Sequence, residues 1–467
     1  MYLDQITGKS DDELSALADA VNVDEWWRLE RPEAIRQVIR NLFRHHDLKQ
    51  LTVEGVLCED DVGSDAKASA SLRVTDRYGD GADIVQVPGE LIRDCNLRAG
   101  DVLTGRLGAA PGPDGRFFMV AVTNVNGKPA WAAQRRRNFC HLTPIHPDRF
   151  LPLEYPGAGS PEVTRMVDLI APQGKGQRTL IVAPPRSGKT MLLKEIANGV
   201  SYNHPRAMLI ALLVDERPEE VTDFIENTQA EVCYSTFDSP PDEHIEVAEK
   251  TLAKAKRLVE FGRDVVVLID SITRLTRAYN AMAPATGRVM SGGIEAISLQ
   301  RAKKLFGAAR NLREGGSLTV MATALVETGS RMDDLIYEEW KGTGNSEIVL
   351  DRRIAERQIW PALDMAKSET RQWSLLFDDQ ERKIRQALRT VTAAPGSMRG
   401  DTAPGSMTAD LLEQIRSTRM NAELLARIGR RIEAGQGGDT EAGRPGARSV
   451  KTGGPGPMRR DRRIPRV

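Results

Sequence analysis

The pattern of apolar and polar positions changes character along the chain. In residues 1–48, apolar residues recur three or four positions apart, as at Leu14 and Leu17, which predicts short amphipathic helices. In residues 50–130, short apolar stretches such as Val53–Leu57 are separated by Gly, Asp and Pro. That pattern indicates a small β-barrel or a sandwich. Two differently built units are therefore expected before the middle of the chain.

The pattern changes again over residues 161–430, where apolar runs alternate with helical periodicity. Leu180–Ala183, Met208–Val214 and Val265–Ile269 are continuously apolar. Such runs are typical of parallel strands that are buried on both faces. Their alternation with helices predicts βαβ units and a doubly wound parallel sheet. The fold class predicted for the chain is therefore multidomain α/β.

Polar segments flank this predicted core. Residues 131–160 form a basic, Pro-rich connector that contains the consecutive arginines Arg135–Arg137. A helix is predicted over 408–429. Residues 431–467 are rich in Gly, Pro and Arg, which predicts a disordered basic tail. Such a tail either contacts nucleic-acid phosphates or only keeps the protein soluble, and the sequence leaves both interpretations open.

Composition narrows the possible classes of function. The 467 residues include 65 Lys plus Arg and 65 Asp plus Glu, so any attraction to nucleic acid has to come from local patches. No run of about 18 apolar residues and no signal-peptide pattern are present, so we expect no contact with a membrane. The four cysteines form no CxxC pair. Reduced thiols in a cytoplasmic protein are the expected state.

The clearest chemical motif is Leu180–Thr190, which reads Leu-Ile-Val-Ala-Pro-Pro-Arg-Ser-Gly-Lys-Thr. It matches a P-loop, with Ala183 in place of the first glycine, and a predicted strand and helix flank it as a P-loop requires. A chance Gly-Lys-Thr on a surface turn would lack that context. Backbone N–H groups would cradle the phosphates of ATP. Lys189 would reach the β and γ phosphates and Thr190 would hold Mg²⁺. The loop residues predicted to bind the nucleotide are Pro185, Arg186, Ser187, Gly188, Lys189 and Thr190.

Two acidic strand ends are candidates for the remaining chemistry. Asp270 closes an apolar strand in the manner of a Walker B carboxylate that supports Mg²⁺. A plain buried strand with a turn aspartate is the alternative, and the position of Asp270 after the P-loop disfavours it. Glu216 follows a second apolar strand, where it could polarise the attacking water. From the residues alone, Glu216 could equally be part of an acidic pair without a chemical role.

Several longer segments resemble the Rho family of bacterial transcription terminators. They are Val214–Val221, Leu268–Asn280, Phe306–Asn311 and Lys341–Asn345, in the order that the family has them. The resemblance implies a homohexameric ring of RecA-like ATPase cores with ATP at the subunit interfaces. It also implies the following organisation: a helical subdomain at 1–48, an OB-like, cold-shock-type RNA-binding domain at 50–130, a connector at 131–160, the RecA-like motor at 161–430 and a basic tail at 431–467.

The resemblance further implies roles for single residues. Glu216 would be the catalytic base, and Arg371 the arginine finger that a neighbouring subunit supplies next to Lys189. Asp270 and Thr190 would hold the metal ion. Nucleotide binding would also involve Met191 and Trp360, which would pack on adenine, and Arg217, which would help to link subunits. RNA would be gripped in the pore by Arg288, Ser291, Gly292, Gly293, Arg331, Lys341, Gly342, Thr343 and Gly344.

One segment departs from the family pattern. Where aromatic residues would stack on RNA bases, the chain has Glu59–Ala68, which reads Glu-Asp-Asp-Val-Gly-Ser-Asp-Ala-Lys-Ala. An acidic surface repels phosphate. Tyr78, Phe117 and Phe118 remain as candidates for stacking, with core filling as the alternative. We therefore expect a weakened preference for C-rich RNA.

The function that the resemblance implies is that of an RNA-dependent ATPase and 5′–3′ RNA/DNA helicase-translocase that terminates transcription. Its expected partners are RNA, the RNA polymerase elongation complex and further copies of the chain. Two alternatives remain: a Rho-like motor that a partner loads onto RNA, and a non-catalytic nucleic-acid-binding modulator that co-assembles with a Rho ring. The modulator is disfavoured because Lys189, Thr190, Glu216, Asp270 and Arg371 are all present.

Overall fold

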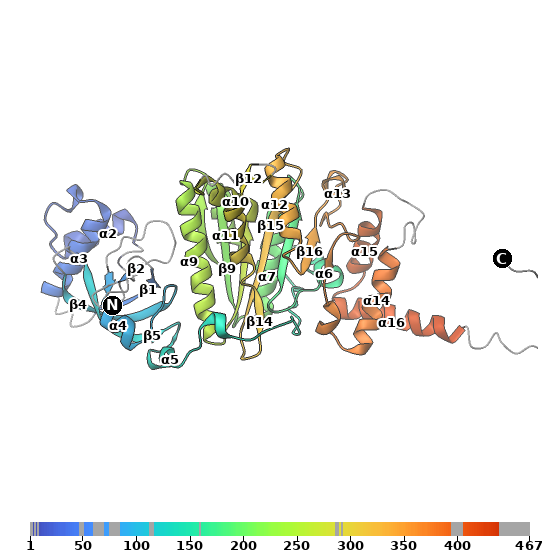
Figure 1. The fold of residues 1–467 in the computed structure, drawn as a ribbon, viewed down its shortest axis with the longest axis horizontal. Coiled ribbons are helices and arrows are strands. Elements are labelled where there is room, and N and C mark those ends of the chain that lie inside the picture. The colour runs from blue at the N-terminus through green and yellow to red at the C-terminus, as the bar shows by residue number, and fades with distance from the viewer. Residues whose placement is uncertain are drawn as a thin grey trace, which may run out of the picture.

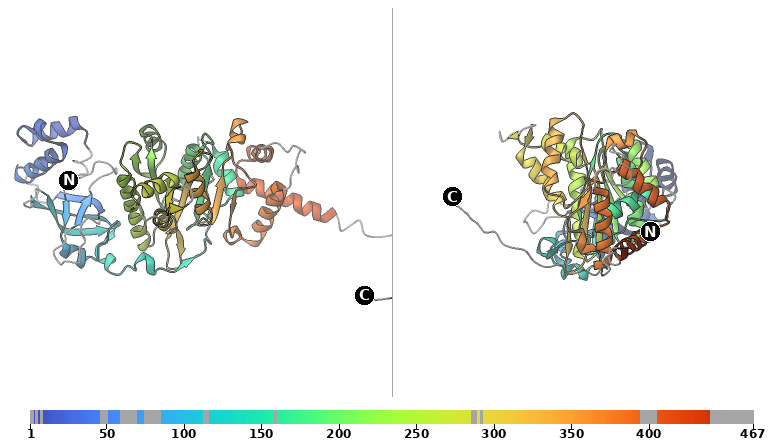
Figure 2. Two further views of the ribbon diagram at one scale, coloured as in Figure 1. Left: turned by 45° about the horizontal axis from the view of Figure 1, so that its top comes forward. Right: turned by 90° about the vertical axis from the view of Figure 1, so that its right-hand side faces the viewer.

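The computed structural model shows an elongated molecule with an α/β core between two smaller units (Figure 1). In two views, the N-terminal helices and barrel lie at one end of the core and the C-terminal helices lie at the other (Figure 2). The structure describes residues 3, 6, 9–45, 51–58, 70–73, 85–111, 116–157, 160–284, 289–290, 293–393 and 405–438. The part of the protein that these ranges cover contains no helix long and apolar enough to cross a membrane.

The N-terminal unit has two main helices, α2 (Asp11–Ala20) and α3 (Arg31–His45). A capping box starts α2, because the Ser10 hydroxyl accepts from the backbone N–H of Glu13 and the Glu13 carboxylate accepts from that of Ser10. The apolar faces of both helices share one hydrophobic cluster with the barrel that follows. Helices and barrel therefore stabilise each other.

The barrel is a closed, five-stranded, OB-like structure. Its strands are β1 (Leu51–Leu57), β2 (Ala70–Arg73), β3 (Val85–Val87), β4 (Val102–Pro111) and β5 (Phe117–Val125), with α4 (Gly89–Asp94) between β3 and β4. Antiparallel neighbours follow the order β3-β2-β1-β4-β5, and a parallel pairing of β3 with β5 closes the sheet. Phe117 is fully buried in this core. Phe118 is partly exposed, and Tyr78 and Glu59–Ala68 lie outside the described residues.

A buried charge cluster joins the barrel to the core. Asp101 precedes β4, Arg136 belongs to the connector, and Glu260 ends helix α9 (Pro241–Glu260). Arg136 Nη2 lies 2.6 Å from Asp101 Oδ2, and Arg136 Nε lies 3.6 Å from Glu260 Oε2. The side chains of Asp101 and Glu260 are 0% exposed and that of Arg136 is 1% exposed. Because buried charges are stable only when they are paired, this cluster fixes the barrel against the core.

Replacing Asp101 by Ala is expected to lower the free energy of unfolding by about 3–5 kcal/mol, because Arg136 would lose its main buried partner. Urea unfolding followed by circular dichroism measures the effect. The control is Arg28→Ala, which removes a solvent-exposed pair with Glu25 and should cost less than about 1 kcal/mol. Equal losses for the two variants would contradict a special role for the buried cluster.

The core is a mostly parallel sheet in the order β10-β9-β11-β15-β8-β16-β17. Its strands are β8 (Arg178–Ala183), β9 (Met208–Glu216), β10 (Glu231–Thr236), β11 (Asp264–Asp270), β15 (Ser317–Leu325), β16 (Ser346–Val349) and the antiparallel β17 (Glu369–Thr370). The connector adds β7 (Pro144–Ile145), which pairs with β14 (Arg310–Leu312). The predicted multidomain α/β fold class is confirmed.

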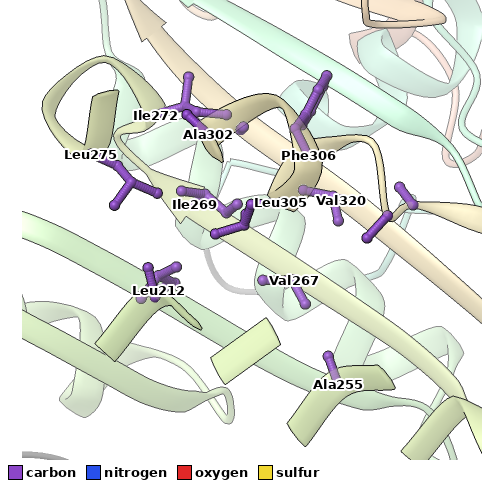
Figure 3. Close-up of a cluster of buried hydrophobic side chains, with 14 of the residues drawn as sticks. Leu212, Ala255, Val267, Ile269, Ile272, Leu275, Ala302, Leu305, Phe306 and Val320 are labelled. Atoms are coloured by element: carbon purple, nitrogen blue, oxygen red, sulfur yellow. The ribbon is translucent and has the colours of Figure 1, made fainter. Parts of the chain in front are cut away.

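Both faces of this sheet are covered by helices. Along β8, Leu180 and Val182 belong to one buried cluster, whereas Ile181 and Ala183 belong to another on the opposite face. Figure 3 shows part of the first cluster, in which Phe306 of α11 packs over the sheet. The helices that cover the two faces are α6 (Pro161–Ile170), α7 (Lys189–Asn203), α8 (Pro218–Asn227), α9, α10 (Ile272–Ala281), α11 (Ala296–Phe306) and α12 (Arg331–Lys341).

The C-terminal helices differ from the sequence-based expectation. Instead of one helix over 408–429, the structure has α15 (Ser406–Arg416) and α16 (Asn421–Gly438). Helix α16 packs with α14 (Asp379–Ala393), and α15 packs with α6 and α16. The buried guanidinium of Arg165 explains the break, because it donates to the carbonyl oxygens of Ile415 and Thr418 and stabilises the end of α15. Helix α16 also continues past residue 431, where the disordered tail was expected to begin. Extending an existing helix costs little.

Candidate functional site

The P-loop lies between β8 and α7. The Ser187 hydroxyl closes it by donating to the carbonyl oxygen of Pro184 at 2.7 Å, while Pro185 and Arg186 are exposed. Gly188 has a φ of 87°, which favours glycine. A Cβ at this position would also lie 2.7 Å from the Trp360 ring. The loop therefore directs its backbone and the start of α7 toward one edge of the sheet.

Three charged side chains meet at that edge. Lys189 Nζ donates to Asp270 Oδ1 at 2.6 Å and to Glu216 Oε1 at 3.1 Å. Glu216 ends β9 and Asp270 ends β11, and the carboxyl ends of parallel strands meet at the same edge. The hydroxyl of Thr323 on β15 donates to Asp270 Oδ1 at 2.8 Å and orients that carboxylate. The structure thus brings together the predicted phosphate-binding cation, catalytic base and metal-binding acid.

Arg274 is a further member of this site that the sequence did not single out. Its guanidinium donates to Glu216 Oε2 and to the carbonyl oxygen of Asp215. The Ser271 hydroxyl accepts from the Arg274 backbone N–H and caps α10. Glu216 is therefore held between two cations, Lys189 and Arg274. The only signal in the sequence was the position of Arg274 one helical turn after Asp270.

Burial dominates the electrostatics of the site. It raises the pKa of Glu216 above its usual value, with the Asp270 carboxylate raising it further, and the cations Lys189 and Arg274 only partly oppose the shift. Burial disfavours the charged form of Lys189, but Asp270 and Glu216 outweigh it and hold the pKa of Lys189 above its usual value. A base with a raised pKa has an increased affinity for the proton of an attacking water.

The raised pKa of Glu216 predicts the pH dependence of ATP hydrolysis. A general base works only when it is ionised, so kcat should fall as the pH drops through a value above the usual range of glutamate. Arg274→Ala removes a cation that lowers this pKa, and should move the acid limb of the kcat profile to higher pH. The control is Arg206→Ala, at an exposed site before β9. An acid limb that stays in place in Arg274→Ala would contradict the assignment.

The surroundings of the P-loop suit a metal–nucleotide complex. Thr190, in the first turn of α7, and Asp270 both offer oxygen atoms, which are the ligands that Mg²⁺ prefers. A Cβ on Gly188 would touch the Trp360 ring and lie 3.8 Å from Met191 Cε. Trp360 and Met191 thus form an apolar surface directly beside the loop. The residues predicted to hold metal and adenine are therefore near the phosphate-binding backbone.

Two of the residues predicted for the nucleotide site are exposed. Arg217 is exposed at the start of α8, adjacent to Glu216. Arg371 is exposed just after β17. Thr370 of β17 pairs with Ser346 of β16, and Ser346 pairs in turn with Thr179 of β8. Thr179 lies at the start of β8, roughly 13 Å along the strand from Ala183, where the P-loop begins. Arg371 is therefore at the opposite end of the sheet from its own P-loop.

The predicted RNA-binding loops are brought together in part. Asn280 Nδ2 donates to the Gly293 carbonyl oxygen at 3.1 Å, and Asn280 Oδ1 accepts from the Glu295 N–H at 2.8 Å. A Cβ on Gly293 would lie 3.8 Å from Met332 Cε, next to the exposed Arg331 that begins α12. Gly293 thus lies beside the side chain of Met332, the residue that follows Arg331. Arg288, Ser291 and Gly292 lie outside the described residues.

The segment from Lys341 to Gly344 lies apart from Arg331. Arg331 begins α12 and Lys341 ends it, so the helical rise per residue places them about 15 Å apart. Lys341 and Gly342 are exposed. The Thr343 carbonyl oxygen accepts from Arg178 Nε at 3.1 Å, and Gly344 is buried against the backbone of β8. These contacts give Thr343 and Gly344 a packing function at the start of β8.

Helix α10 connects the nucleotide site with the loops that are predicted to bind RNA. Arg274 near its start contacts Glu216, and Asn280 near its end holds Gly293. Between them, Arg277 Nε donates at 2.9 Å to the buried carboxylate of Asp333 in α12. The two sites therefore share one rigid element.

Comparison with known proteins agrees with this geometry. Residues 163–370 match the model of the ATP synthase alpha/beta family, nucleotide-binding domain. Two solved structures share the fold. An ATPase from the type III secretion system of pathogenic bacteria has a TM-score of 0.51 at 23% identity, covering 62% of this chain and 87% of that chain. The ATP synthase subunit NeqB from Nanoarcheaum equitans has a TM-score of 0.50 at 18% identity, covering 62% and 78%.

Curated relatives identify the family. The transcription termination factor Rho of Cereibacter sphaeroides is 44% identical over 414 residues, which cover 87% of this chain and 95% of the relative. The chain belongs to the Rho family. The Rho factor of Chromobacterium violaceum is 52% identical, covering 66% of this chain and 74% of the relative, and that of Thermotoga maritima is 46% identical, covering 76% and 81%. This Rho-family chain is an ATP hydrolase, since it combines family membership with an ATP synthase-type nucleotide domain.

Proposed function

We propose that this Rho-family protein is an RNA-dependent ATPase that moves 5′ to 3′ along RNA and thereby terminates transcription. The observation that carries the proposal is the contact of Lys189 with both Glu216 and Asp270 at one edge of the sheet. A cation for phosphate, a base for water and an acid for a metal are the parts that phosphoryl transfer to water needs. A non-catalytic modulator would need none of them together, so the motor is favoured.

The arrangement supports a direct hydrolytic mechanism. The phosphates of ATP would lie over the P-loop backbone, with Lys189 on the β and γ oxygens. Mg²⁺ held by Thr190 and Asp270 would neutralise charge on those oxygens. Glu216 would orient the attacking water and accept its proton, while Arg274 holds the Glu216 carboxylate in place. ATP and water would be converted to ADP and phosphate, which would then leave the site.

The placement of Arg371 supports assembly into a ring. Because this side chain lies at the opposite end of the sheet from its own P-loop, it can serve only the site of a neighbouring copy. Head-to-tail contacts form a ring when the rotation between copies closes, and the homohexamer is the form proposed for this chain. Gly293 and Arg331 would then contact RNA in the central pore, together with Arg288, Ser291 and Gly292.

The proposed setting is nascent RNA in the cytoplasm, with the RNA polymerase elongation complex as the target. The curated relatives support it through their name, transcription termination factor. The acidic segment Glu59–Ala68 favours one variant of the proposal, in which a protein partner helps to load the motor onto RNA.

Directional strand displacement tests the proposed function. An RNA–DNA duplex with a single-stranded RNA tail at the 5′ side should be unwound in the presence of ATP and Mg²⁺, whereas the same duplex with a 3′ tail should not. Lys189→Ala serves as the inactive control, because it removes the phosphate-binding cation. Displacement from the 3′ tail only, or displacement without ATP hydrolysis, would overturn the proposal.

A further inference from the structure

The connector carries an exposed basic surface. From Lys128 to Pro147 the sequence contains no Asp or Glu. The run Arg135–Arg137 divides by orientation, because Arg136 is buried in the charge cluster whereas Arg135 and Arg137 are exposed. Arg137 Nη1 lies 3.7 Å from Glu314 Oε1, its one ion-pair partner in the part of the chain that the structure describes, and the Arg137 side chain stays 69% exposed. A pair so long and so exposed leaves Arg137 available to phosphate.

An exposed aromatic ring lies within this surface. Trp131 opens the short helix α5 (Trp131–Gln134) and is 62% exposed. The guanidinium carbon of Arg135 lies 6.0 Å from the centre of its ring. An exposed tryptophan beside an arginine offers a base a flat surface to stack on and its phosphate a cation to pair with.

The helix that carries Trp131 is held against the barrel by hydrogen bonds. Asn96 Nδ2 donates to the Ala133 carbonyl oxygen at 3.2 Å, and Gln134 Nε2 donates to the Asp94 carbonyl oxygen at 2.7 Å. These contacts attach α5 to the loop after α4 of the barrel. A preorganised surface binds more tightly than a mobile one, because little conformational entropy is lost on binding.

The position of α5 on the barrel also suits the binding of nucleic acid. The Val102 N–H donates to Asn126 Oδ1 at 2.9 Å, and Val102 pairs with Val56, so the connector starts at the end of the barrel where β1 ends. The loop between the first two strands is a region through which OB-folds bind oligonucleotides. In this chain the sequence there, Glu59–Ala68, contains no aromatic residue. Figure 1 shows α5 next to β5, on the path from the barrel to the core.

We propose that Trp131, Arg135 and Arg137 form a binding site for single-stranded RNA on the connector, in which Trp131 stacks on one base and the two arginines contact the adjoining phosphates. The site rests on the proposed function, since it would hold RNA on its way to the motor. It supplies the aromatic stacking and the positive charge that Glu59–Ala68 cannot provide.

The test measures the binding of a fluorescein-labelled oligo(rU) to the full-length protein by anisotropy. Trp131→Ala should weaken binding by roughly fivefold to a hundredfold, the loss expected for one stacked base. Trp131→Phe should retain most of the affinity. The matched control is Trp27→Ala, since Trp27 is 65% exposed but lies in the N-terminal helical unit. Arg135→Ala with Arg137→Ala should make the salt dependence of log K shallower by about 1.4, the value for two phosphate contacts on a single strand.

ATPase assays and the measured oligomeric state separate the possible outcomes. If the site exists, Trp131→Ala raises the RNA concentration needed for half-maximal ATPase stimulation and leaves the maximal rate and the ring unchanged. Unchanged affinity in Trp131→Ala would overturn the site while leaving the proposed function intact. Loss of affinity only through loss of ring assembly would also overturn it, because Trp131 would then be a subunit contact. Absence of RNA-stimulated hydrolysis in the unaltered protein would instead contradict the proposed function.

Discussion

Replacing Arg371 by Ala is expected to lower the ATPase rate by roughly 10³–10⁵-fold, the range for an arginine finger. The expectation rests on the proposed ring, because Arg371 lies at the opposite end of the sheet from its own P-loop and would act on the site of a neighbouring copy. Nucleotide binding should change far less than turnover, since Lys189 and the P-loop are unaffected. Steady-state hydrolysis and binding of a fluorescent ATP analogue measure the two effects separately.

Mixed rings give this prediction its sharpest test. Rings assembled from equal amounts of Arg371→Ala and Glu216→Gln subunits contain some interfaces with an intact Glu216 on one side and an intact Arg371 on the other. About a quarter of the interfaces should be of this kind in a head-to-tail ring. Mixing two inactive variants should therefore restore part of the activity. If no mixture hydrolyses ATP, although mixed rings are shown to form, Arg371 does not act in trans.

Glu216→Gln is expected to lower kcat by roughly 10²–10⁴-fold, which is the contribution of a positioned general base. Glutamine keeps the shape of the side chain but cannot accept a proton from water. The matched control is Glu219→Gln, on the exposed first turn of α8, which should leave the rate unchanged. A Glu216→Gln protein that hydrolyses ATP within a few-fold of the original rate would show that another group is the base.

The sequence predicted the strands of the core well because their physics is local. Leu180–Ala183 and Val265–Ile269 are apolar at every position, as a strand buried on both faces has to be, and they lie in β8 and β11. The P-loop could also be identified from the sequence, because its residues are contiguous. Arg274 was missed because its partner Glu216 lies 58 positions earlier, and only the strand order brings them together.

Long-range contacts also explain the other differences. A helix over 408–429 has suitable periodicity, but it is interrupted where Arg165, far away in sequence, donates hydrogen bonds to the carbonyl oxygens at the end of α15. The choice between barrel and sandwich depended on the parallel pairing of β3 with β5, which no local pattern encodes. The distance between Arg331 and Lys341 follows from α12, because the residues between them form this helix.

The most direct test of the central claim is the steady-state ATPase rate of the full-length protein without nucleic acid and with C-rich RNA, mixed RNA or single-stranded DNA. The account predicts that RNA strongly stimulates hydrolysis and that Glu216→Gln abolishes this stimulation. Because the Glu59–Ala68 region has no aromatic residues to stack on bases, C-rich RNA should stimulate hydrolysis little more than mixed RNA does. A folded, assembled ring that hydrolyses no ATP with any of these nucleic acids would contradict the account and favour a non-catalytic modulator.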